Sequence, residues 1–131
     1  MTVPSLSKIL LVEDEQDIQM VASMALEELG GFEVAVASSG LEALAAAPSF
    51  GPDLILLDVM MPDLDGPGTF AALRQLEGFP MPPVIYMTAR AQNSEIEEYR
   101  SSGAIDVIVK PFDPMTLAST VTEIWTRYHS S

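Results

Sequence analysis

Five short apolar runs, separated by longer amphipathic stretches, constrain what this chain can fold into. The runs cover residues 9–12, 34–37, 54–57, 84–87 and 107–109. They consist mostly of leucine and β-branched residues, as expected for strands that are covered on both faces of a sheet. Only the second run has small residues throughout, which favours an edge position. Because strands and helices alternate strictly, the sequence predicts an α/β fold, a doubly wound five-stranded parallel sheet with helices on both faces.

Five helical patterns follow these runs. In the first, apolar residues recur at helical spacing over residues 18–29, and the glycine pair Gly30-Gly31 ends the helix. The second pattern begins near Leu41 and is expected to end at Pro48, because proline interrupts helices. The third and fourth helices are expected over about residues 67–76 and 94–100. The apolar stripe of the last helix consists of Leu117, Val121, Ile124, Trp125 and Tyr128.

Composition excludes several classes of site. Six Lys and Arg residues against nineteen Asp and Glu give a net charge of −13, which argues against direct nucleic-acid binding and against an anionic membrane surface. The chain has no cysteine, so disulfides and thiolate metal sites are excluded. The single histidine, His129, is expected to be a tail residue, and the eight methionines are expected to pack in the core.

The 131 residues suit one domain. No apolar run approaches the ~18 residues that a membrane span needs, and none has the length of a signal peptide. We therefore expect a cytoplasmic protein in which residues 1–131 form a single domain with its core at about 8–128. No output domain is expected after the last helix.

Polar or charged residues follow four of the five runs, where each strand is expected to end. They are Glu13-Asp14, Asp58, Thr88 and Lys110. The carboxyl ends of parallel strands meet at one edge of a sheet, so these side chains should converge in one cleft. Three carboxylates there would repel one another unless cations compensate, and Lys110 and a magnesium ion could do so. A carboxylate beside Mg²⁺, an ammonium group and a hydroxyl is equipped to attack phosphorus.

Four motifs at these positions resemble the receiver domain of two-component response regulators. They are Leu10-Leu11-Val12-Glu13-Asp14-Glu15, the segment from Leu57 to Gly66, Met87-Thr88-Ala89 and Lys110-Pro111-Phe112. The resemblance extends from about Lys8 to Tyr128. It implies a flavodoxin-like three-layer sandwich with the strand order 2-1-3-4-5.

The resemblance also implies roles for the acidic residues. Asp58 would accept a phosphoryl group and become 4-aspartylphosphate. Asp14, Asp58 and the backbone carbonyl of Met60 would bind Mg²⁺ or Mn²⁺, and Glu13 would act through water. The protein would catalyse only its own phosphorylation and slow dephosphorylation, so it is not expected to be an enzyme in the usual sense.

Further implications concern the hydroxyl and the ammonium group. Thr88 would hydrogen-bond the phosphoryl oxygen, and Lys110 would pair with the phosphate. The Lys110–Pro111 peptide bond is expected to be cis, an isomer that proline makes accessible. The implied phosphodonor is a histidine kinase or a histidine phosphotransfer protein. The output would be contact with a downstream protein, through a monomer or a weak phosphorylation-dependent dimer.

The sequence departs from the family pattern in two places. Val107 occupies a position where the family usually has an aromatic ring that moves inward on phosphorylation, and Tyr86 or Tyr99 are candidates to replace it in part. Met60 and Arg90 stand where other receivers control water access to the phosphoryl group. Neither is an acid or an amide, which predicts slow self-dephosphorylation.

The same residues also allow other interpretations. Asp14 could cap the first helix with Asp17. Asp63 and Asp65 could suggest a calcium loop, but the acids required at both ends of such a loop are missing, so turn formation and helix capping are favoured. The chain could also be a pseudo-receiver that is never phosphorylated. A phosphohydrolase of the haloacid-dehalogenase type is disfavoured, because such enzymes need an aspartate where this chain has Met60.

Overall fold

Five parallel strands alternate with five helices in residues 2–89 and 92–130, the parts of the chain that the computed structural model describes. The strands are β1 (Lys8–Val12), β2 (Glu33–Ala37), β3 (Leu54–Asp58), β4 (Val84–Thr88) and β5 (Asp106–Val109). The helices are α1 (Gln16–Glu28), α2 (Gly40–Phe50), α3 (Gly66–Arg74), α4 (Asn93–Ser101) and α5 (Leu117–Ser130). The sheet order is β2-β1-β3-β4-β5, which confirms the predicted order and the edge position of β2.

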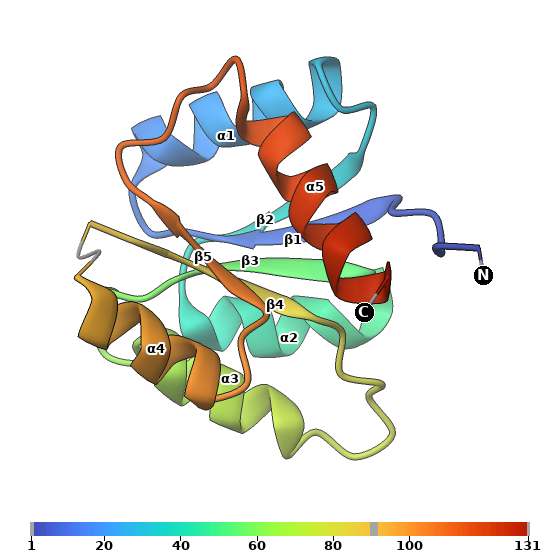
Figure 1. Cartoon of the computed structure of the whole chain (residues 1–131). Coiled ribbons are helices and arrows are strands. Elements are labelled where there is room, and N and C mark those ends of the chain that lie inside the picture. Colours follow the sequence, from blue (N-terminus) through green and yellow to red (C-terminus); the bar gives the residue numbers. More distant parts are fainter. Residues whose placement is uncertain (1, 90–91, 131) are drawn as a thin grey trace.

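Helices cover both faces of the sheet, as predicted. Figure 1 shows α1 and α5 on one face and α2, α3 and α4 on the other. Alternate residues of each strand enter different layers, because successive side chains in a strand point to opposite faces. Leu11 and Leu56 pack with α1 and α5, whereas Leu10 and Ile55 pack in the layer with α2 and α3. The result is a three-layer sandwich.

Two helix boundaries differ from the sequence prediction. Helix α2 does not end at Pro48 but continues through it to Phe50, and Gly51 then closes it in the left-handed conformation, with φ 64°. Pro48 lies in the last turn, where its missing N–H removes only one intrahelical bond. Helix α3 ends at Arg74 rather than near residue 76. The N–H groups of Gln75 and Leu76 donate to carbonyls three residues back, which forms a tighter turn after the helix.

Two expectations about side chains were wrong. His129 is not in a loose tail: it belongs to α5, and its ring centroid lies 4.2 Å from that of Trp125. The methionines do not all pack in the core, since at least half of the surface of four of them is exposed. These are Met20 (64%), Met24 (50%), Met60 (62%) and Met115 (73%). Trp125 is buried as expected, and its indole N–H donates to the carbonyl of Pro4 over 2.7 Å.

No helix in the described part of the chain combines the length and the apolar character that a membrane span requires.

Candidate functional site

The acidic residues converge at the carboxyl ends of the adjacent strands β1 and β3. Glu13 and Asp14 follow β1 directly, and Asp58 is the last residue of β3. Each of the three offers a carboxylate oxygen, and these oxygens all lie within 4.8 Å of one another. We call this group, together with Lys110, the acid pocket. Strand pairing brings its members together from positions far apart in sequence, as the strand ends predicted.

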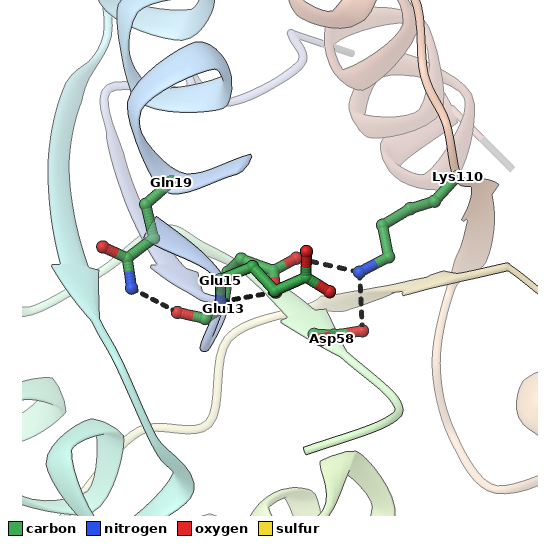
Figure 2. A network of polar contacts seen from close by, with 5 residues as sticks. All are labelled: Glu13, Glu15, Gln19, Asp58 and Lys110. Atoms are coloured by element: carbon green, nitrogen blue, oxygen red, sulfur yellow. Dashed lines mark hydrogen bonds and ion pairs between the residues drawn. The ribbon is translucent and has the colours of Figure 1, made fainter. Parts of the chain in front are cut away.

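Lys110 reaches the acids from the end of β5 (Figure 2). Its Nζ lies 2.9 Å from Oε1 of Glu13 and 3.1 Å from Oδ1 of Asp58. The backbone fixes this approach, because the Lys110 N–H donates to the carbonyl of Thr88 over 2.8 Å. The Lys110–Pro111 bond is cis, as expected. One ammonium group therefore serves two carboxylates.

Glu13 is fully buried, and its polar atoms are held from several sides. Oε2 accepts a hydrogen bond from the backbone N–H of Glu15, and the Glu13 N–H donates to the carbonyl of Ala37. Burial raises the pKa of Glu13 from its ordinary value of 4.5 to about 7, although the hydrogen bond from Lys110 opposes this shift. For Lys110, burial alone would lower the pKa, but its contacts with Glu13 and Asp58 outweigh burial and raise it.

The acid pocket suits a divalent cation bound through oxygen. Three carboxylates face a single ammonium group. Oδ1 of Asp58 is buried and, apart from its ion pair with Lys110, receives no hydrogen bond from any described residue. Hard cations such as Mg²⁺ prefer carboxylate oxygens. A divalent cation would balance the excess negative charge of the three carboxylates. It would also give the buried Oδ1 of Asp58 a second positively charged partner.

The acid pocket opens to the surface beside β3 and β5. A cavity of about 340 Å³ is lined there by Asp58, Met60, Ala89 and Lys110, among others. Met60 is largely exposed at this opening, whereas Thr88, the last residue of β4, is buried. Arg90, the other residue predicted to control water access, lies outside the described residues.

Backbone hydrogen bonds, one of them to β4, hold the loop after β3. The Val59 N–H donates to the carbonyl of Met87 on β4, and the Gly66 N–H donates back to the Val59 carbonyl over 2.9 Å. Asp65 is the N-cap of α3 and accepts from the N–H of Gly68 over 2.8 Å, which confirms the capping role predicted for it. Asp63 adopts a positive φ of 68° in the preceding turn. Backbone and capping hydrogen bonds therefore hold the loop that follows Asp58.

Local geometry decides the N-cap of α1 and locates Val107. The N-cap of α1 is Glu15, not Asp14, and no side chain caps that helix. Val107 is half-buried on β5, directly opposite Tyr86 of β4. Sequence reasoning missed Gln19, whose side chain contacts the Glu13 carbonyl, because a glutamine on an amphipathic helix gives no signal of such a contact.

Comparison with known proteins agrees with this geometry. Residues 9–122 match the sequence model of the response regulator receiver domain. The chain is 39% identical over 120 residues to the alkaline phosphatase synthesis transcriptional regulatory protein PhoP of Bacillus subtilis, which covers 92% of this chain and 49% of that protein. It is 37% identical over 109 residues to the regulatory protein AtoC of Escherichia coli, covering 83% of this chain and 23% of that protein. The chain thus spans about half, or less, of these relatives' length.

Solved structures show the same likeness over nearly the whole chain. The chemotaxis response regulator CheY4 of Vibrio cholerae superposes with a TM-score of 0.82 at 32% identity, covering 92% of this chain and 99% of that one. A putative response regulator from Chloroflexus aurantiacus gives a TM-score of 0.80 at 30% identity, covering 94% and 100%. This chain therefore belongs to the response regulator receiver domains of two-component signalling.

Proposed function

We propose that this domain receives a phosphoryl group on Asp58 from a phosphohistidine of a histidine kinase or a histidine phosphotransfer protein. The observation that carries the proposal is the position of Lys110, whose Nζ contacts both Glu13 and Asp58 beside the Asp14 carboxylate. A carboxylate held next to an ammonium group and two further acids is arranged for Mg²⁺-dependent phosphoryl transfer. Residues about 8–128 would act as one receiver unit.

In the transfer step, a carboxylate oxygen of Asp58 forms a bond to phosphorus and the phosphorus–nitrogen bond of the phosphohistidine breaks. The donor imidazole leaves with the electron pair of that bond. Lys110 lies 3.1 Å from Oδ1 of Asp58, so its ammonium group can stabilise the negative oxygens of the phosphoryl group. Thr88 ends the neighbouring strand and would donate its hydroxyl to one of these oxygens.

The residues that would hold Mg²⁺ are Asp14, Asp58 and the backbone carbonyl of Met60, with Glu13 acting through water. When bound, the ion supplies positive charge that stabilises the transferring phosphoryl group. The rest of the work is positioning by the chain itself. Hydrogen bonds from Lys110 and from the Glu15 N–H hold the Glu13 carboxylate. The hydrogen bond from the Gly66 N–H to the Val59 carbonyl holds the loop that follows Asp58.

An exposed apolar face of α1 is the surface on which we propose that the phosphodonor docks. Val21, Met24 and Leu29 are 42%, 50% and 54% exposed, and Met115, in the loop before α5, is 73% exposed. Together they line a groove of about 290 Å³. A second cavity continues this face from Val21 to Lys110 at the acid pocket. Exposed apolar patches of this kind mark protein interfaces, and an apolar helix of the donor would bring its phosphohistidine to Asp58.

The net charge of −13 supports an output through protein contact rather than direct nucleic-acid binding. Of the two relatives named above, PhoP is a transcriptional regulatory protein and AtoC is a regulatory protein, and both are about twice as long as this chain or longer. An output of the phosphorylated domain would then be a change in its affinity for a partner protein.

Intact mass spectrometry after incubation with acetyl phosphate and Mg²⁺ tests the phosphorylation. The expected result is a mass gain of one phosphoryl group that Asp58→Asn abolishes and EDTA prevents. Asp63→Asn is the matched control, because Asp63 is an exposed carboxylate in the same loop and asparagine tolerates its positive φ. No mass gain in the wild-type protein would instead favour a receiver that acts without phosphorylation.

Comparison of two phosphodonors tests the docking surface. Met24→Asp should slow transfer from a phosphorylated histidine kinase but leave phosphorylation by acetyl phosphate unchanged. Leu41→Asp is the control, since Leu41 is 67% exposed on α2, on the other face of the sheet. Equal effects of the two substitutions on kinase transfer would rule out α1 as the docking face.

A further inference from the structure

Gln19 lies in the first turn of α1, and its side-chain amide faces the end of β1 (Figure 2). Its Nε2 donates to the backbone carbonyl of Glu13 and, over 3.0 Å, to the hydroxyl of Ser38. Because a carbonyl can only accept hydrogen bonds, the NH₂ end of the amide must face Glu13. Gln19 therefore ties α1 to the chain segment that carries the acids.

The β2–α2 loop fixes Gln19 from the other side. The Ser38 N–H donates to the carboxylate of Glu42 over 3.1 Å, and the Glu42 N–H donates to the hydroxyl of Ser39, the N-cap of α2. This reciprocal arrangement holds the start of α2 and, with it, Ser38. The amide of Gln19 thus joins two ordered elements rather than extending freely into solvent.

The Glu13 carbonyl that Gln19 binds belongs to the peptide unit between Glu13 and Asp14. Peptide units are planar, so fixing this carbonyl also fixes where the Asp14 backbone begins. The Asp14 side chain has no other support: no hydrogen bond or ion pair from the residues that the structure describes reaches its carboxylate. Its direction therefore depends on its backbone.

Repulsion works against that direction. Carboxylate oxygens of Glu13, Asp14 and Asp58 lie within 4.8 Å of one another, and Lys110 contacts only Glu13 and Asp58. Without a cation, Asp14 is the acid best able to lower this repulsion by turning toward solvent, because it is only half-buried. Something other than charge has to keep it turned inward.

We propose that Gln19 is a positioning residue of the acid pocket. By holding the Glu13–Asp14 peptide unit, it keeps the Asp14 carboxylate directed toward Asp58, so that the pocket is ready for a divalent cation. This inference rests on the proposed function, since it assumes that the acid pocket binds Mg²⁺. Helix α1 would thus support metal binding through the amide of Gln19, not through an acidic side chain of its own.

Titration of the unphosphorylated protein with MgCl₂ by isothermal calorimetry tests the inference. Gln19→Leu keeps the size of the side chain but removes the donor, and Gln19→Ala repeats the test if leucine packs poorly. Either should weaken Mg²⁺ binding by about tenfold, the low end of what partners of metal ligands contribute. Gln16→Leu is the matched control, because Gln16 is an exposed amide in the same turn of the same helix.

Two further measurements separate positioning from folding. Gln19→Leu should remain fully folded in EDTA, as Gln16→Leu does, although it loses the stability of two hydrogen bonds. The carbonyl ¹³C shift of Glu13 should change only in Gln19→Leu. Weaker Mg²⁺ binding in a Gln19→Leu protein that is partly unfolded in EDTA would make Gln19 a purely structural residue and overturn the inference. Unchanged Mg²⁺ affinity would overturn it as well.

These outcomes differ from a failure of the proposed function. If the wild-type protein binds no Mg²⁺ and accepts no phosphoryl group, the function itself is wrong and the inference falls with it. If the wild-type protein binds Mg²⁺ and Gln19→Leu binds it equally well, only the role of Gln19 is wrong.

Discussion

Tyr86 lies directly opposite Val107 in the pairing of β4 with β5. The Tyr86 side chain is fully buried, and its ring centroid lies 5.3 Å from that of Tyr99 on α4 and 5.9 Å from that of Phe70 on α3. Val107 contributes little bulk to this layer, so Tyr86 supplies the aromatic ring from the neighbouring strand. Thr88 lies two residues further along β4 and faces the same side. The ring pair is therefore the aromatic contact that links the strand of Thr88 to α4.

We predict that Tyr99 carries the phosphorylation response to α4. Its ring meets Tyr86 edge to face, and α4 has no fully buried residue of its own among those described. Tyr99→Ala should therefore reduce the amide shifts that a beryllofluoride adduct of Asp58 produces in residues 93–101. These shifts are measured by ¹H–¹⁵N NMR with and without the adduct.

Tyr86→Phe is the matched control for this experiment, because it keeps the ring and removes only a hydroxyl. That buried hydroxyl lies near the Ser102 side chain but forms no hydrogen bond of good geometry with a described residue, so its loss should leave both the shifts and the stability nearly unchanged. Adduct-induced shifts that are as large in Tyr99→Ala as in the wild-type protein would contradict the role of the ring pair.

A second prediction concerns pH and follows from the raised pKa of Glu13. This pKa is about 7 in the folded protein, against an ordinary value of 4.5 in the unfolded chain. Between these values the folded state binds more protons than the unfolded state, so stability falls as pH rises through this window. Above pH 7 the buried negative charge of Glu13 lowers the free energy of unfolding by at most about 3 kcal/mol. In EDTA, Glu13→Gln should remove this pH dependence and be more stable than the wild-type protein at about pH 8.

Urea unfolding, followed by the fluorescence of the buried Trp125, measures this effect in EDTA at about pH 5 and about pH 8. Glu97→Gln is the control, since Glu97 is an exposed acid on α4. The same slope of stability against pH in the wild-type protein and in Glu13→Gln would show that Glu13 is not the titrating group.

The strands and the acid pocket could be predicted from the sequence because both depend on short-range patterns. Each apolar run became a strand, and the residues directly after β1, at the end of β3 and directly after β5 met at one edge, as parallel strands require. The strand order came from the family resemblance, since local patterns do not determine which strands become neighbours.

The surface of α1 shows where prediction from sequence stops. Val21 and Leu29 share the helical spacing of the buried residues Ala22 and Leu26, yet both are exposed. The apolar arc of α1 is wider than its contact with the core, and spacing alone does not show which part the core covers. The contact of Gln19 with the Glu13 carbonyl was equally hidden, because it depends on where α1 begins relative to β1.

Gly66 gives a third prediction, about the loop that carries Asp58. A Cβ atom at Gly66 would lie 2.6 Å from the carbonyl oxygen of Asp58 and 2.8 Å from Cα of Val59. Both are backbone atoms that cannot turn away. Gly66→Ala should therefore cost about 1–3 kcal/mol of stability, as overpacking does, and slow phosphorylation by acetyl phosphate.

Gly68→Ala is the comparison for Gly66→Ala. Its Cβ would first meet the end of the Leu64 side chain, which can rotate, and alanine gains helix propensity over glycine. Chemical denaturation of both variants gives the difference. A smaller stability loss in Gly66→Ala than in Gly68→Ala would show that the loop after Asp58 moves to make room.

The last prediction concerns how long the phosphoryl group stays on Asp58. Met60 is 62% exposed and lines the cavity that leads to Asp58 and Lys110. A thioether is only a weak hydrogen-bond acceptor, so Met60 does not orient a water molecule for attack on phosphorus. Met60→Asn places an amide at the same opening and should shorten the lifetime of the phosphorylated protein, measured by loss of ³²P or by intact mass over time.

Met60→Leu keeps the apolar surface and should leave the lifetime unchanged. If Met60→Asn and Met60→Leu decay at the wild-type rate, access of water past residue 60 does not set the lifetime.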